Sequence, residues 1–185
     1  FLALARRKPP ERKAVDINAI INASLELLSY QFRNESVEIK FDLAPNLPHV
    51  NGDGDQLTQV FTNLALNATQ ALHDWEGQRQ ITIHSEPLGD NVIITVTDTG
   101  PGIAPELRSR VFEPFFTTKG SNGGTGVGLA LCLNIIETHG GAMRLESTPG
   151  HGAAFIITLP AVTAEALAKE AEPAIRVELP DRLKI

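Results

Sequence analysis

Two pairs of short apolar segments, each joined by a turn, decide what kind of sheet this chain can form. Ile81–Ile83 and Val92–Val96 are rich in β-branched residues, and the stretch Leu88-Gly-Asp-Asn91 between them is typical of a hairpin turn. Met143–Ser147 and Ala153–Leu159 repeat the arrangement around a Pro-Gly-His-Gly turn. Because strands joined by short turns pair antiparallel, these segments argue against a doubly wound parallel sheet.

Three further segments have the three- and four-residue apolar spacing of amphipathic helices. The spacing predicts helices from Asp16 to about Asn34, from about Asp53 to Leu72, and from Val127 to Thr138. Val37–Leu43 alternates as one more strand, and Pro105–Arg110 is expected to be a short helix. We therefore predict an α/β fold, a two-layer sandwich in which a mixed, mostly antiparallel sheet packs against about three helices.

Length and composition are those of one globular domain with short extensions. The chain has 185 residues, of which 42% are hydrophobic, and its net charge of −6 argues against a general nucleic-acid binder. Cys132 is the only cysteine, which excludes an intrachain disulfide and fits a reducing compartment. No apolar run approaches the roughly 18 residues of a membrane span. We expect a cytoplasmic chain that makes no contact with a membrane.

Asn63 and Asn67 stand four residues apart on the second predicted helix and therefore share a face. Their neighbours Leu64, Leu66 and Ala68 are apolar, so both amides are expected at the edge of a buried stripe. An amide oxygen is a ligand that Mg²⁺ accepts beside water and phosphate. The pattern leaves two interpretations open, a metal and phosphate site or two structural asparagines that bond the backbone.

Asp98 begins an Asp-Thr-Gly-Pro-Gly-Ile stretch that directly follows Val92–Val96. A carboxylate at a strand end can accept one specific hydrogen bond inside an apolar pocket, and the exocyclic amine of adenine is a suitable donor. Gly100 and Gly102 permit positive φ and a close approach of a ligand. The alternative interpretation is an ordinary Asp-Gly turn.

A glycine-rich stretch, Gly123–Ala130, opens the third helix. Backbone N–H groups at such a helix N-terminus form an anion site. The stretch is not a P-loop, because no Gly-Lys-Ser/Thr follows, and a dinucleotide-binding motif would need a strand before it. Lys119 is the cation of the long, aperiodic Glu113–Gly126 loop, which we expect to be a mobile lid. A flexible linker is the alternative.

The four motifs occur in an order and spacing that resemble those of a known family. Asn-x-x-x-Asn, Asp-x-Gly-x-Gly, Phe-x-x-Phe-Phe and Gly-x-Gly-x-Gly-Leu resemble the N, G1, F and G2 boxes in the catalytic and ATP-binding domain of bacterial sensor histidine kinases. These belong to the wider family of gyrase, mismatch-repair and heat-shock-chaperone ATPases. The resemblance covers roughly residues 14–160 and implies a Bergerat-type ATP-binding fold.

The resemblance also implies a role for each matching residue. Asn67 would be the Mg²⁺ ligand, Asn63 its companion on the phosphate side, and Asp98 the acceptor for the adenine amine. The base pocket would be lined by Gly100, Gly102 and Ile103, the lid anchored by Phe112, Phe115 and Phe116, and the phosphates held by Lys119, Gly124, Gly126, Gly128 and Leu129. No catalytic residue is assigned by the sequence.

Asn63 bears on which reaction is expected. In the hydrolytic relatives this position carries a glutamate that activates water, and an amide cannot serve as that base. A protein-histidine kinase domain with Mg-ATP is therefore the main hypothesis. The rivals are a self-contained gyrase-like ATPase and a non-catalytic interaction domain. Ala153 departs from the family pattern, since many relatives carry Ser or Thr there, which puts one minor contact in doubt.

None of the five histidines stands where a phosphoacceptor would be expected, so the acceptor histidine is placed on a helical hairpin outside this chain. Residues 1–13 resemble the end of that hairpin or a linker, and 161–185 are expected to be a linker or tail. Leu183-Lys-Ile185 resembles the opening of a receiver domain. We therefore expect a histidine-bearing hairpin and a response regulator or receiver as partners, and a parent protein longer than this chain.

Overall fold

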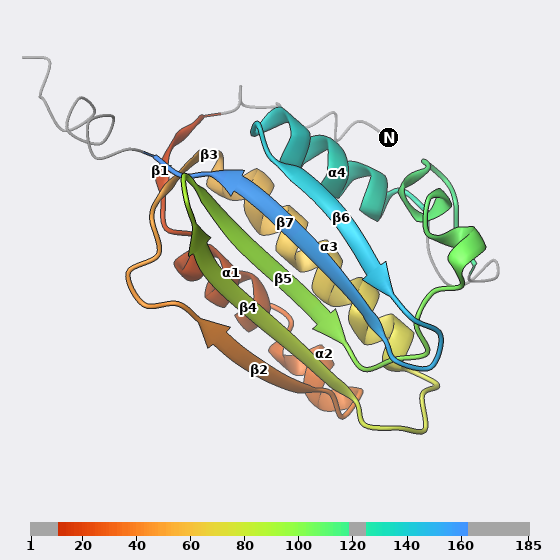
Figure 1. Ribbon diagram of the computed structural model, residues 1–185. Helices are drawn as coiled ribbons and strands as arrows, with labels where there is room; N and C mark the ends of the chain where they lie inside the picture. Colours follow the sequence, from red (N-terminus) through yellow and green to blue (C-terminus); the bar gives the residue numbers. More distant parts are fainter. Residues whose placement is uncertain (1–10, 119–124, 163–185) are drawn as a thin grey trace, which may run out of the picture.

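Five strands form one mixed sheet in the computed structural model, which describes residues 11–118 and 125–162 (Figure 1). Their order across the sheet is β2-β4-β5-β7-β6, and only β2 and β4 run parallel. The strands are β2 (Glu38–Leu43), β4 (Gln80–Leu88), β5 (Asn91–Asp98), β6 (Ala142–Ser147) and β7 (Ala153–Pro160). Both predicted hairpins are present, β4–β5 and β6–β7, so the sheet is mostly antiparallel as predicted.

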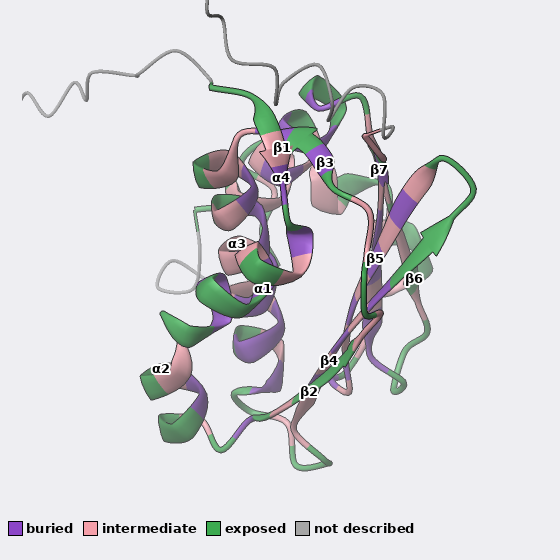
Figure 2. Ribbon diagram, turned by 90° about the vertical axis from the view of Figure 1, so that its left-hand side faces the viewer, coloured by how far each residue is buried: buried purple, intermediate pink, exposed green. Residues whose placement is uncertain are grey.

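The helices all cover the same face of this sheet (Figure 2). They are α1 (Ile17–Glu26), α2 (Ser29–Asn34), α3 (Gly54–Leu72) and α4 (Gly128–Thr138). The hydrophobic core lies between the two layers, and its largest fully buried side chains include Ile21, Leu57, Leu64, Ile94, Ile136 and Ile157. The prediction of a two-layer α/β sandwich is confirmed. None of the helices described here is long and apolar enough to cross a membrane.

The side chains of β5 alternate between the two faces, and this alternation places the first polar group of the site. Val92, Ile94 and Val96 point toward the helices and are buried. The next residue on that face is Asp98, which ends the strand. A strand with a period of two therefore carries a carboxylate into the apolar layer between sheet and helices.

The first predicted helix, Asp16 to Asn34, is two helices. Asp16 caps α1 as expected, since its side chain accepts from the Ala19 N–H at 3.1 Å. The break follows Glu26, where the Leu28 N–H bonds to Leu25 instead of continuing the four-residue pattern. The buried Ser24 hydroxyl donates to the Ile20 carbonyl at 2.7 Å, a local bond that tends to bend helices. No glycine or proline marks this position, so residue spacing alone predicted one helix.

Two other segments also differ from prediction. The helix expected at Pro105–Arg110 is a pair of single 3₁₀ turns, η1 (Pro105–Leu107) and η2 (Arg110–Phe112). A two-stranded sheet of β1 (Lys13–Val15) and β3 (Val50–Gly52) was not predicted. Three-residue strands are too short for alternation to identify them, and their pairing joins residues about 37 positions apart.

The start of α3 is joined to the end of α4 by side chains. Asp53 caps α3 by accepting from the N–H groups of Asp55 and Gln56, each at 3.0 Å. His139, just after α4, is buried; its Nδ1 donates to the Ile135 carbonyl at 2.7 Å and its Nε2 accepts from the Asp53 N–H at 3.0 Å. The two helices are therefore antiparallel and fastened together at this end.

The segment before β1 reaches the same place. The Glu11 N–H donates to the Asp53 carboxylate at 3.0 Å, and the Arg12 guanidinium donates to the Thr138 carbonyl. The chain thus enters the domain on the end of α3 and α4 that His139 fastens.

Replacing Asp53 with alanine should lower the free energy of unfolding by about 1 kcal/mol, because the cap of α3 is lost. Burial alone would raise the pKa of Asp53, but the N–H donors of Gln56, Glu11 and Asp55, together with His139, outweigh it and lower the pKa below 3.8. A carboxyl with a depressed pKa contributes stability above its usual value that is lost as the pH falls through the folded value. Urea denaturation at neutral pH and below pH 4 measures both effects.

Asp53→Asn is the matched control, since asparagine caps helices as well as aspartate does but does not titrate. It should resemble wild type at neutral pH and lose less stability than wild type in acid. Equal acid sensitivity in all three proteins would contradict this account of Asp53.

Candidate functional site

Asp98 is a buried carboxylate, 5% exposed, at the end of the central strand β5. The Gly100 N–H donates to its Oδ1 at 2.8 Å, and the Ala153 backbone N–H on β7 is a second donor. Desolvation raises the pKa of Asp98 above 3.8, although both backbone hydrogen bonds oppose it. An ionised carboxylate has about four acceptor positions, so Asp98 can still accept a hydrogen bond from a ligand.

The turn after Asp98 is in backbone contact with the turn between β6 and β7. Gly102 has φ +73°, and a Cβ there would lie 2.3 Å from the Thr148 carbonyl oxygen. Gly152 has φ +79°, and its Cβ would lie 1.9 Å from the Asp98 carbonyl oxygen. No side chain fits at either position, so glycine is required for the two turns to pack this closely.

The asparagines of α3 face the first turn of α4. A Cβ on Gly128 would lie 3.9 Å from Cγ of Asn63 and 4.0 Å from Nδ2 of Asn67. Both asparagines are half-buried, as predicted for the edge of the apolar stripe. Val127, the N-cap residue of α4, makes no side-chain capping bond, so within the described residues the first N–H groups of this helix have no side-chain cap. This end of α4 therefore favours an anion close to two amides.

The beginning of the long loop is held by backbone geometry. The Phe115 N–H donates to the Gly126 carbonyl at 2.8 Å. Gly126 has φ +66°, and a Cβ would come within 2.5 Å of the Phe115 carbonyl carbon. Phe115 itself has φ +67° and is 79% exposed, which is rare for a bulky residue and has a conformational cost. The two ends of the loop are thus joined although the first of them carries an exposed ring.

The other two phenylalanines of this segment contact the domain. Phe112 packs edge-on against Phe155 of β7, with ring centroids 6.3 Å apart. The Arg110 guanidinium lies over the Phe116 ring, 4.4 Å from its centroid, a cation–π contact that the sequence reasoning missed. Phe112 therefore anchors the segment to the core, as the resemblance implied, and Phe116 is covered by Arg110.

The fold brings most of the predicted site residues to one end of the helical layer. Asp98, Gly100, Gly102 and Ile103 form one turn, Asn63 and Asn67 face Gly128, and Phe115 contacts Gly126. Leu129 is half-buried against the core. Lys119 and Gly124 lie outside the described residues, so their phosphate roles remain predictions.

Cys132 stands behind the asparagines and does not take part in polar chemistry. It is fully buried, and desolvation raises the pKa of its thiol to about 12, although a hydrogen bond with the Asn63 side chain opposes this. A thiol with such a pKa is not a nucleophile near neutral pH. Cys132 is therefore inert in this setting, and its thiol donates to the Val60 carbonyl at 3.7 Å.

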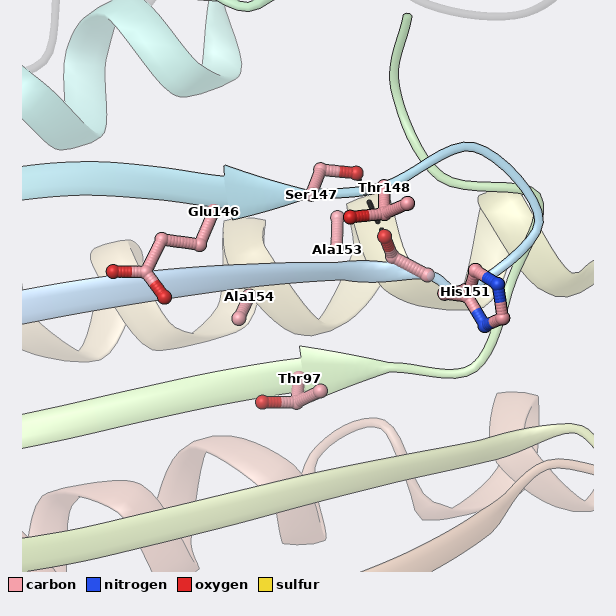
Figure 3. A pocket seen from close by; sticks show the side chains of 8 residues that line it. Thr97, Glu146, Ser147, Thr148, His151, Ala153 and Ala154 are labelled. Carbon is pink, nitrogen blue, oxygen red and sulfur yellow. Dashed lines mark hydrogen bonds between the residues drawn. The ribbon is translucent and has the colours of Figure 1, made fainter.

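A shallow pocket of about 190 Å³ opens at the same end of the sheet (Figure 3). Its lining includes Thr97, Glu146 and Ala154, which share the face of the sheet that the helices leave uncovered. Asp98 and the asparagines are not among its lining residues. The pocket therefore lies beside the residues that the sequence motifs single out, and Ser147 and Gly152 border it.

The fold and these contacts define a nucleotide-binding α/β domain in which a buried carboxylate, two amides and a helix N-terminus converge. A family model described as histidine kinase-, DNA gyrase B-, and HSP90-like ATPase matches residues 52–163. The chain is 45% identical over 151 residues to the sensor histidine kinase ZraS of Salmonella typhi, covering 81% of this chain and 31% of that protein. It is 42% identical over 149 residues to ZraS of Escherichia coli K12, covering 80% of this chain and 31% of that protein.

Solved structures agree with these relatives. The catalytic domain of the histidine kinase ThkA superposes with a TM-score of 0.70 at 33% identity, covering 82% of this chain and 96% of that one. Full-length ShkA in complex with AMPPNP gives 0.73 at 30% identity, covering 83% of this chain and 32% of that one. The chain belongs to the histidine kinase-, DNA gyrase B- and HSP90-like ATPase family, as the catalytic, ATP-binding domain of a two-component sensor histidine kinase. It spans about a third of the length of the ZraS proteins.

Asp98→Asn should not reduce the stability of the domain at pH 8, because the charged form of this buried carboxyl is disfavoured by desolvation. A carboxyl with a raised folded pKa favours the native state at pH below its usual value of 3.8, and this advantage is lost as the pH rises through the folded value. The stability of the variant relative to wild type should therefore increase with pH. Urea denaturation at several pH values measures this difference, and a difference that stays constant with pH would contradict it.

Proposed function

We propose that this domain binds Mg-ATP and donates the γ-phosphate to a histidine outside the chain. The observation that carries the proposal is the convergence of the buried Asp98 carboxylate with Asn63 and Asn67, which face Gly128 at the uncapped start of α4. The carboxylate suits a base amine, whereas the amides and the helix N-terminus suit phosphates. One nucleotide can use both because the two sets lie at the same end of the helical layer.

The adenine would be read by Asp98. The Gly100 and Ala153 N–H groups use two of the about four acceptor positions of the carboxylate, which leaves acceptor positions for the exocyclic amine. Gly100, Gly102 and Ile103 would line the base pocket, since a Cβ on Gly100 would already lie 2.9 Å from Oδ1 of Asp98. A buried acceptor with this geometry discriminates strongly against bases that lack a donor at the same place.

The phosphates would lie between α3 and the start of α4. Gly128 leaves space beside both asparagines, and no protein hydrogen bond to the Asn67 side chain is found within residues 11–118 and 125–162. A half-buried amide without such a partner fits a hard cation, so Asn67 would hold Mg²⁺ and Asn63 would lie on its phosphate side. When bound, Mg²⁺ would neutralise charge on the phosphates. Gly126, Gly128 and Leu129, with Lys119 and Gly124, would hold the phosphate oxygens.

Transfer rather than hydrolysis is favoured by what stands at position 63. An amide has no basic site to accept a proton from water, so Asn63 cannot act as the base that activates a water molecule. The protein would position the phosphates and exclude water, which is most of what phosphoryl transfer requires. The gyrase-like ATPase and the non-catalytic interaction domain are both less consistent with relatives that are sensor histidine kinases.

The partners follow from the same proposal. ThkA has been solved in complex with the response regulator protein TrrA, at 30% identity and a TM-score of 0.69 to this chain. For this chain we propose a histidine-bearing hairpin as phosphate acceptor and a response regulator or receiver as the next acceptor. We also propose that residues 14–160 form the kinase domain, with 1–13 and 161–185 as its connections, and that it works in the cytoplasm.

Calorimetric titration tests the nucleotide site. Wild type should bind Mg-ATP with micromolar-to-millimolar affinity, and Asp98→Asn should bind it at least about tenfold more weakly. The asparagine would keep its oxygen on the Gly100 N–H and present an NH₂ group to the adenine amine, so two donors would face each other. Wild type without binding heat, or a variant with unchanged affinity, would contradict the proposal.

A transfer experiment tests the reaction. With γ-labelled ATP, this chain should neither label itself nor release phosphate quickly, because it has an amide at position 63 and no histidine in an acceptor context. Addition of the parent protein's hairpin as a separate polypeptide should give label on its histidine, and Asn67→Asp should change the Mg²⁺ dependence of that labelling. Stable label on this chain alone would overturn the assignment of the acceptor to another segment.

A further inference from the structure

Four residues lie in one row across the sheet at the end where the site forms. The register pairs Ile81 of β4 with Asp98 of β5, Asp98 with Ala153 of β7, and Ala153 with Ser147 of β6. Residues paired across a ladder share a face, so all four side chains point toward the helices. Ser147 is therefore about 10 Å from Asp98, two strands away, on the face where the base would bind.

Ser147 joins the two turns that border this row. The Ile103 N–H donates to its Oγ at 2.8 Å, and its hydroxyl donates to the Gly152 carbonyl at 2.7 Å (Figure 3 shows the second bond). A hydroxyl has one hydrogen to donate, and this bond uses it. Another hydrogen bond between the turns joins backbone groups, from the Gly150 N–H to the Pro101 carbonyl at 2.7 Å. Within the described residues, Ser147 thus provides the side-chain connection.

We propose that Ser147 is a positioning residue for the base, because its hydroxyl holds Ile103 at a defined distance from the strand end that carries Asp98 and Ala153. This inference rests on the proposed function. Ala153 contributes only a methyl group between Ser147 and Asp98, so the floor of the pocket is apolar there. The width of the pocket is then set by the turn from Asp98 to Ile103.

The backbone contacts explain why one hydroxyl matters. Gly102 and Gly152 pack without room for a Cβ, so the turns can separate but cannot move closer. Ser147→Ala leaves the Ile103 N–H and the Gly152 carbonyl without their partner. Unpaired groups of this kind are satisfied by water, which the turn can admit only by moving away from β6. The base contacts would widen, whereas α3 and α4, which face the phosphates, would be unaffected.

A general loss of stability is the competing explanation, and Ser85 is the matched control. Its hydroxyl donates to Asn18 at 2.9 Å and accepts from the Ala44 N–H at 3.2 Å, and it is fully buried. Ser85 lies four residues along β4 from Ile81, about 13 Å from the row at the site. Ser85→Ala therefore removes the same pair of bonds from the same sheet, away from the proposed pocket.

The experiment is calorimetric titration of the whole chain with ATP, adenosine and Mg-tripolyphosphate, at a temperature where every variant is folded by circular dichroism. Ser147→Ala should lower the affinity for ATP and for adenosine about tenfold each, which corresponds to about 1.4 kcal/mol. Its affinity for Mg-tripolyphosphate should change less than about twofold. Ser147→Thr, which keeps the hydroxyl, should have an affinity for ATP within about threefold of wild type. Ser85→Ala should have an affinity for ATP within about twofold of wild type.

Each other result counts against the inference. Unchanged ATP affinity in Ser147→Ala, equal losses for ATP and tripolyphosphate, or the same loss in Ser85→Ala would overturn the positioning role and leave the proposed function intact. Wild type that binds none of the three ligands would overturn the proposed function itself. If Ser147→Ala is unfolded, Ser147→Cys replaces it, because a thiol is a weak donor and acceptor of similar shape, and the same ligand pattern is expected.

Discussion

Helix α3 carries a buried apolar stripe and, at its edge, two asparagines, and the rest of the domain packs around that stripe. Its buried residues fill the space between α1, α4 and the sheet, from Leu57 through Leu64 to Leu72. Asn63 and Asn67 stand on the edge of this stripe and meet the start of α4. A polar group on a packed helix is held in place by its apolar neighbours, so the amides are positioned before any ligand arrives.

Asp98 shows the same combination in the sheet. Its strand is apolar on the helix side until the last residue, which is a carboxylate whose pKa is raised mainly by desolvation. Two backbone N–H groups compensate part of that penalty, and a ligand donor would compensate more. The native state therefore retains a group that is unfavourable for folding, and in the proposed function this group would accept the hydrogen bond of the base.

Local patterns predicted the hairpins and the long helix α3, because hydrophobic period, N-caps and turn residues act over a few positions. The convergence of the motifs was implied by the family resemblance. Features that depend on distant partners were not predictable. The pairing of β1 with β3, the bond between His139 and Asp53 and the bond between Ser147 and Ile103 join residues 35 to 86 positions apart. The break before α2 was not predicted for another reason: a serine hydroxyl that bonds within the helix does not change the spacing of the apolar residues. Lys119 and Gly124 stay predictions.

The junction at His139 joins the antiparallel helices α3 and α4 at one end of the pair. Glu11, Arg12 and His139 make hydrogen bonds at the start of α3 and the end of α4. Asn67 and Gly128, which would contact the phosphates in the proposed function, lie toward the other end of the pair. Asn67 is 14 residues from Asp53, about 21 Å along the helix axis. Over this length, a rotation of α3 by about one degree about Asp53 would move Asn67 by about 0.4 Å. A small tilt that leaves the contacts near Asp53 intact would therefore change the separation of Asn67 and Gly128 by several tenths of an ångström, enough to alter the coordination of a metal ion.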